Sequence, residues 1–79
     1  MTRDEKGLCR MSAEIMAKAM TTDSLLDKLV KLGVMLNKYN DLSEHEGKFI
    51  ERNYSDEITR CEIAIDVVKA EIRSRVKES

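Results

Sequence analysis

Apolar residues recur at steps of three and four along the last part of the chain, which is the spacing of one face of an α-helix. The clearest run extends from Ile58 to Val76. Its main stripe consists of Ile58, Cys61, Ile65, Val68 and Ile72. The pattern predicts a long helix over residues 43–77 that begins at a capping box formed by Ser43 and Glu46. Polar residues 53–56 leave a separate helix start open, but the absence of Pro and Gly among them favours continuity.

Two further runs with the same period predict helices over residues 4–20 and 24–40. The stripe of the first run is Leu8, Met11, Ile15 and Ala19. The stripe of the second run is Leu25, Leu29, Leu32, Leu36 and Tyr39. Short polar residues at 21–24 favour helix caps, yet the apolar phase continues across them without a slip. The predicted fold is therefore all-α, a single domain over residues 1–79. It is an antiparallel hairpin of two long helices, the first either broken near residues 21–24 or continuous.

A second apolar stripe lies almost opposite the first on the predicted C-terminal helix, and it includes Ile63, Val67 and Ala70. A surface helix with one neighbour needs only one stripe, so this helix either lies between other helices or meets a second chain. Because the chain offers few helices, the sequence favours a second chain and a two-fold homodimer that forms a helical bundle. Ile63, Val67 and Ala70 are the predicted interface. Met16 and Met20 are added because flexible Met side chains suit adaptable binding surfaces.

The charge balance does not indicate a nucleic-acid-binding chain. Net charge is −1 and the isoelectric point is about 5.8. Four basic residues near the C-terminus still form a candidate nucleic-acid patch, although they also complement the helix dipole. They are Lys69, Arg73, Arg75 and Lys77.

Nothing in the sequence predicts a membrane span, a secretory signal or a disulfide framework. No apolar run approaches the ~18 residues of a span, and the first residues are charged. Cys9 and Cys61 are the two cysteines, and we expect them to be reduced in a cytoplasmic protein.

Candidate chemistry is equally sparse. His45 is the single histidine, and neither it nor the two cysteines show the spacing of metal ligands. We therefore expect no catalytic residue, no metal, no cofactor and no small-molecule substrate.

Two short stretches resemble known families. Residues 1–6, Met11 and Leu25–Leu29 resemble the plasmid copy-number proteins of the Rop type. Those proteins are helical hairpins that dimerise and bind paired RNA loops, so the resemblance implies an RNA-binding regulatory hairpin. Residues 42–68, with Phe49 and the run 61–65, are similar to the small helical co-chaperones of type III secretion needle subunits. That resemblance implies a protein that holds an aggregation-prone partner.

The function favoured by the sequence is a small, non-enzymatic protein-interaction module. It would act as an adaptor, chaperone or inhibitor through an apolar helix face, as a homodimer or with another protein. The alternative hypotheses are an RNA-binding regulatory hairpin of the Rop type and a protein like the type III secretion co-chaperones.

Overall fold

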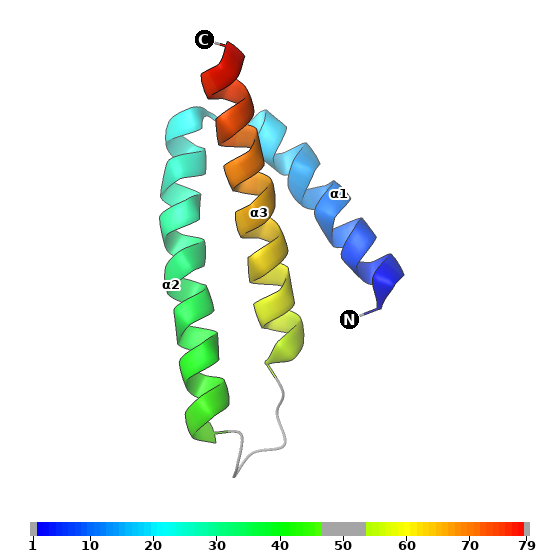
Figure 1. The fold of residues 1–79 in the computed structure, drawn as a ribbon, viewed down its shortest axis with the longest axis vertical. Coiled ribbons are helices and arrows are strands. Elements are labelled where there is room, and N and C mark those ends of the chain that lie inside the picture. The colour runs from blue at the N-terminus through cyan, green and yellow to red at the C-terminus, as the bar shows by residue number, and fades with distance from the viewer. Residues whose placement is uncertain (1, 47–53, 79) are drawn as a thin grey trace.

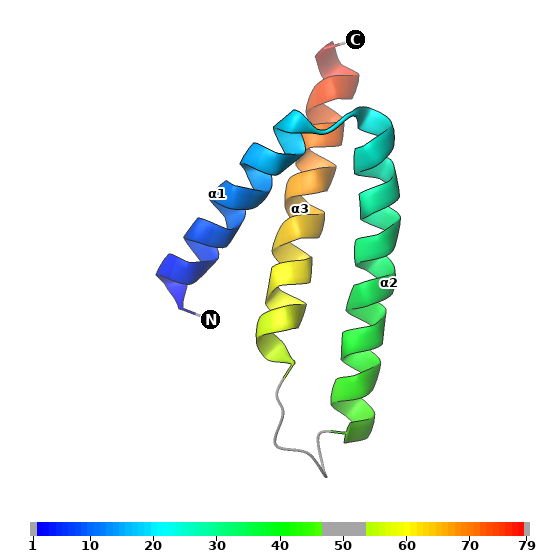
Figure 2. The same ribbon diagram turned by 180° about the vertical axis from the view of Figure 1, so that it is seen from behind.

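The chain forms three α-helices in the computed structural model, which describes residues 2–46 and 54–78 (Figure 1). They are α1 (Arg3–Ala19), α2 (Thr22–Glu46) and α3 (Ser55–Glu78). These residues contain no strand, so the all-α prediction is confirmed. α2 and α3 run antiparallel, and α1 packs on the other side of α3 (Figures 1 and 2). α3 is therefore the central helix, with a neighbour on each side.

The break between α1 and α2 has a local cause. α1 ends at Ala19, and Met20 adopts an extended conformation with φ −88° and ψ 151°. Thr21 then caps α2, because its Oγ1 accepts the backbone N–H of Ser24 at 3.2 Å. The break predicted near residues 21–24 is present, and a continuous helix across this point is wrong.

The predicted boundary near residues 41–42 is wrong, because α2 continues to Glu46 and Ser43 lies inside it. No Pro or Gly interrupts residues 34–46, so nothing in the backbone forces the helix to end at its polar residues. The continuous helix over residues 43–77 is also wrong, since Tyr54 is non-helical and α3 begins at Ser55. The alternative start within residues 53–56 is the correct one. The Tyr39 and Tyr54 rings lie 5.7 Å apart, which joins the C-terminal part of α2 to the beginning of α3.

The core lies on both sides of α3. Its buried members are Ala17 of α1, Leu25 and Leu32 of α2, and Ile63, Val67 and Val68 of α3. Ile63 and Val67 are 9% and 4% exposed within the single chain. The second apolar stripe of α3 therefore does not need a second chain to be buried. The premise of the predicted interface is wrong, and the physical reason is that α1 packs as a separate helix against this side of α3.

Candidate interaction surface

The outer side of α1 carries a row of large apolar side chains that touch no core. Leu8, Met11 and Ile15 are 67%, 60% and 69% exposed. The opposite side of α1 packs against the core through Cys9, Ala13 and Ala17. Because these two sets lie on opposite sides of the helix wheel, α1 is apolar on two faces and buries one of them.

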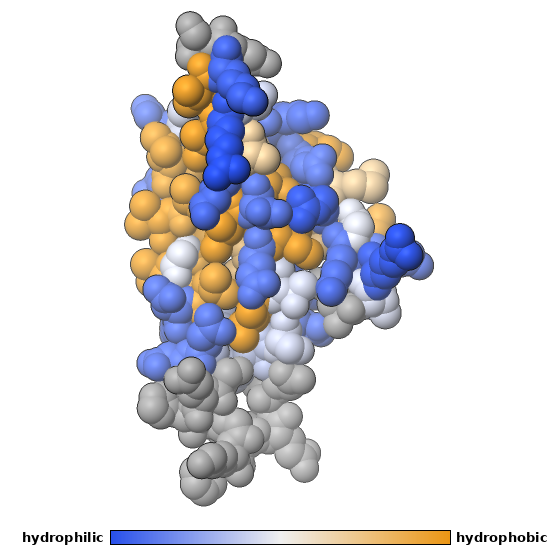
Figure 3. Space-filling model, in the orientation of Figure 1, coloured by the Kyte–Doolittle hydropathy of each residue, from blue (hydrophilic) through white to orange (hydrophobic). Residues whose placement is uncertain are grey.

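A second exposed apolar row lies on α2. Leu26, Val30 and Val34 recur at steps of four and are 47%, 67% and 63% exposed. The space-filling view shows apolar residues gathered over α2 on the left of the molecule (Figure 3). Large apolar side chains that gather on a surface mark contact sites more often than single exposed ones do. α2 thus offers a second surface suited to contact with another protein.

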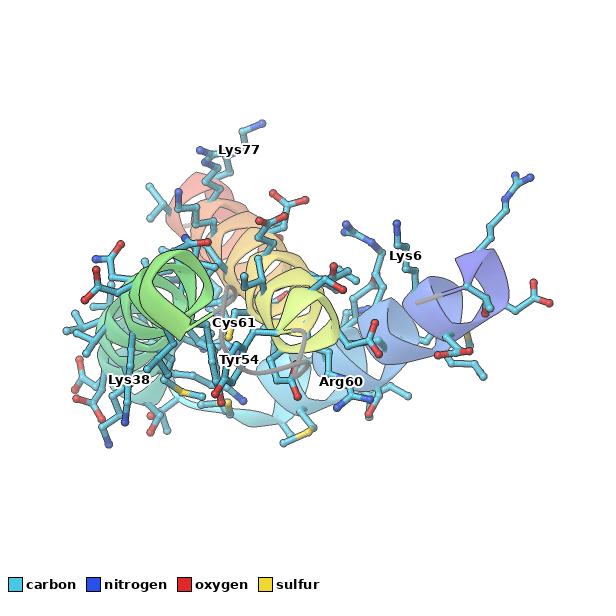
Figure 4. All side chains as sticks on the ribbon, turned by 90° about the horizontal axis from the view of Figure 1, so that it is seen from below. Lys6, Lys38, Tyr54, Arg60, Cys61 and Lys77 are labelled. Atoms are coloured by element: carbon cyan, nitrogen blue, oxygen red, sulfur yellow. The ribbon has the colours of Figure 1, made fainter. Side chains whose placement is uncertain are left out.

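An apolar groove of about 340 Å³ lies between the splayed helices α1 and α2, over α3. Its apolar lining comes from all three helices and consists of Cys9, Ala13, Met16, Leu32, Met35, Cys61 and Ala64. The charged residues that line it are both basic, Lys28 on α2 and Arg60 on α3. The view along the helices shows Cys61 between α3 and α2, and Arg60 on the side of α3 nearer α1 (Figure 4).

The two cysteines line this groove as free thiols. Cys61 is buried, whereas Cys9 is partly exposed. Burial, with a smaller contribution from the charge of Glu62, raises the pKa of the Cys61 thiol above its usual value of 9.0. Cys61 is therefore protonated near neutral pH and is a poor nucleophile there.

Charged residues occupy the opposite seam between α1 and α3. Arg10 and Asp66 form an ion pair across it at 3.3 Å, with both side chains largely exposed. A cleft of about 290 Å³ beside them is lined by Glu14, Lys18 and Glu71. Exposed pairs of this kind contribute little to stability, so this ion pair helps to orient α1 against α3 but adds little to the free energy of unfolding.

Arg75 joins α3 to the junction of α1 and α2. Its guanidinium donates hydrogen bonds to Glu71 Oε1, to Thr22 Oγ1 and to the carbonyl of Ala17, each at 3.1 Å. The same group lies 3.5 Å from the Lys18 carbonyl. A cation at the C-terminal carbonyls of α1 also complements its helix dipole.

The predicted basic patch does not form one surface. Lys69, Arg73 and Lys77 are exposed, but the half-buried Arg75 is turned toward α1 and α2. Arg75 follows Arg73 by two residues, which places the two side chains about 200° apart on a helix. Arg75 therefore points away from the side of α3 that carries the other three basic residues.

The predicted interface residues are not brought together. Ile63 and Val67 lie in the core, Met20 packs partly against it, and Ala70 and Met16 are exposed. Sequence reasoning missed the row of Leu8, Met11 and Ile15 as a surface. Its spacing was visible, but periodicity does not tell which of two apolar faces turns inward.

Other kinds of site have little support in the described residues. These residues contain no cluster of three or more His, Cys, Asp or Glu side chains that could hold a metal ion. His45 lies within α2, and its side chain falls outside the described part of the structure. Within the same residues, no helix combines the length and apolar character that crossing a bilayer requires.

The chain matches no protein-family model, and no curated protein and no solved structure is significantly similar to it.

Proposed function

We propose that the chain is a small, non-enzymatic protein-interaction module that acts through an apolar helix face as a homodimer. An adaptor, a chaperone and an inhibitor are the roles that such a module can fill. The proposal is supported by one observation. Two helices expose rows of large apolar side chains, on α1 and on α2, although the core between the helices is already filled by other residues.

The physical argument is one of surface free energy. Each exposed Leu, Val, Ile or Met side chain would gain about 1.5–3 kcal/mol if it were fully buried. Single exposed apolar residues are common in monomers, but the rows on α1 and α2 follow helical spacing and can meet another helix along their length. A second copy presents the same rows, so a two-fold contact between like rows buries that row on both copies.

Sedimentation velocity over a range of concentrations tests the proposal. We expect the wild-type chain to sediment as a dimer at higher concentration. A charge placed in one of the two rows, by Ile15→Asp or Val30→Asp, should weaken the dimer. Both positions are exposed, so circular dichroism should show unchanged helicity.

Ser74→Asp is the matched control, because it adds the same charge at an exposed position of α3 outside both rows. It should sediment as the wild type does. A wild-type chain that remains monomeric at every concentration would contradict the proposed homodimer. A dimer that tolerates both row variants would contradict the use of an apolar helix face.

A further inference from the structure

The outer face of α1 carries an apolar row between two opposite charges, Asp4 seven residues before Met11 and Lys18 seven residues after it. We propose that α1 pairs with α1 of a second copy, antiparallel, about a two-fold axis at Met11. This inference rests on the proposed function, because it names the face through which the module associates. It assigns the contact to one row of five positions, Asp4, Leu8, Met11, Ile15 and Lys18.

The five positions follow one another at steps of four, three, four and three. That is the spacing of the inward positions of a two-helix coiled coil. The three central members are large exposed apolar side chains, and both end members are exposed charges. From Asp4 to Lys18 the row extends about 21 Å, at 1.5 Å for each residue. A second helix could therefore lie along the row over almost the whole of α1.

The charges select the direction of the second helix. In an antiparallel pair centred on Met11, a residue some steps before Met11 faces the residue the same number of steps after it. Leu8 and Ile15 of the two copies then meet about 1.5 Å out of register, within reach of their side chains. Asp4 then faces Lys18 of the second copy, and Lys18 faces its Asp4, so two opposite-charge pairs close the ends of the contact. A parallel pair would instead place Asp4 against Asp4 and Lys18 against Lys18. Like charges in contact oppose association, so the row favours the antiparallel pair.

The same face is accessible in the folded chain. The core-facing side of α1 carries Cys9, Ala13 and Ala17, nearly opposite the row. Away from the junction, α1 diverges from α2, and the view along the helices shows the two on opposite sides of α3 (Figure 4). A helix that approaches the outer face of α1 therefore meets α1 before it meets α2.

Charge exchange between the two ends tests the pairing by analytical ultracentrifugation at low ionic strength. Asp4→Lys alone, or Lys18→Asp alone, turns both attractive pairs of the dimer into repulsive ones. Each single variant should raise the dimer dissociation constant by about tenfold. The double variant, Asp4→Lys with Lys18→Asp, restores opposite charges at both ends and should dimerise as the wild type does. Added salt should reduce the difference between single variants and wild type.

A mixture of the two single variants gives a second readout. Each variant alone carries like charges at the two ends of its row, positive in one and negative in the other. In an antiparallel heterodimer every end pair is again of opposite sign. Mixing the two variants should therefore recover a dimer that neither forms well alone.

Two controls separate pairing from effects on folding. Asp23→Lys removes an acidic residue from the first turn of α2, as Asp4→Lys does in α1. Lys69→Asp makes the same charge change as Lys18→Asp at an exposed position of α3. Both controls should keep the wild-type dissociation constant, and circular dichroism should show equal helicity for all variants.

The outcomes distinguish this inference from the proposed function. A wild-type dimer that the single variants leave unchanged would overturn the α1 pairing. If Val30→Asp weakened that dimer, the proposed function would still hold, with the contact on α2. A dimer that the double variant fails to restore would also overturn the antiparallel pairing. A monomeric wild type would overturn both.

Discussion

Arg75 hydrogen-bonds to groups on all three helices. Its donors reach Glu71 on its own helix, Thr22 at the beginning of α2 and the last carbonyls of α1. Helix C-termini leave carbonyl groups without intrahelical partners, and Arg75 supplies a charged donor to them. A residue that appears from the sequence to belong to a basic surface is thus part of the packing that holds α1 and α2 in place.

We expect Arg75→Met to lower the free energy of unfolding by about 1–2 kcal/mol, because partly buried hydrogen bonds from a charged group are lost. The side chain is 24% exposed, and this limits the loss. Urea unfolding followed by circular dichroism measures it. Arg73→Met is the matched control, since Arg73 is exposed and its replacement should change stability by less than about 0.5 kcal/mol. Equal losses for the two variants would contradict a special role for Arg75.

Cys61 should make stability fall at alkaline pH. Its folded-state pKa is raised by burial, so the thiol ionises first in the unfolded chain as the pH passes 9.0. Above that pH the unfolded state binds fewer protons than the folded state, and the free energy of unfolding decreases as pH rises. Below it, Cys61 contributes no pH dependence.

Urea unfolding of wild type and Cys61→Ala, from neutral pH to about pH 10, isolates this effect. The wild type should lose stability faster with pH than the variant, by at most about 1.4 kcal/mol per pH unit, the limit for one proton. Cys9→Ala controls for the loss of a thiol. If both variants follow the wild-type slope, the burial of Cys61 does not affect its titration.

At the scale of the helices, the apolar spacing predicted which residues share a helix face more accurately than it predicted where each helix begins and ends. The break at residues 21–24 was visible because Thr21 has the chemistry of a cap. The Ser43–Glu46 pair has the same chemistry, yet both positions lie inside α2. A capping motif caps a helix only where the backbone before it leaves the helix, and no residue near Ser43 requires that.

The two Thr/Ser sites can be compared directly. Thr21→Ala removes the side-chain acceptor of the Ser24 N–H and should lower the free energy of unfolding by about 1 kcal/mol. Ser43→Ala replaces a residue inside α2 by a better helix former, so it should be neutral or slightly stabilising. Thermal unfolding of both variants under the same conditions measures the contrast. A Ser43→Ala loss as large as that of Thr21→Ala would place a helix start at Ser43 after all.

At the scale of the whole molecule, the sequence predicted that the second apolar stripe of α3 needs a second chain, whereas the structure buries Ile63 and Val67 within one chain. The break at residues 21–24 turns one long helix into two, and α1 then covers Ile63 and Val67. The uncovered faces are those of α1 and α2. Periodicity within each segment could not reveal this, because which face turns inward depends on how three separate helices pack together.

The same substitution at two valines tests this arrangement. Val67 lies on the side of α3 that faces α1 and is 4% exposed, whereas Val30 is 67% exposed on α2. Val67→Asp buries a charge without a partner and should lower the free energy of unfolding by about 3 kcal/mol or more. A chain of this length has a stability of about 4–12 kcal/mol, so the variant should lose much of its helicity at moderate temperature. At a concentration where the wild type is monomeric, Val30→Asp should keep the wild-type helicity and unfolding midpoint, because its charge remains in water. If Val67→Asp were instead as stable and helical as Val30→Asp, Val67 would lie on the surface and α1 would not cover α3.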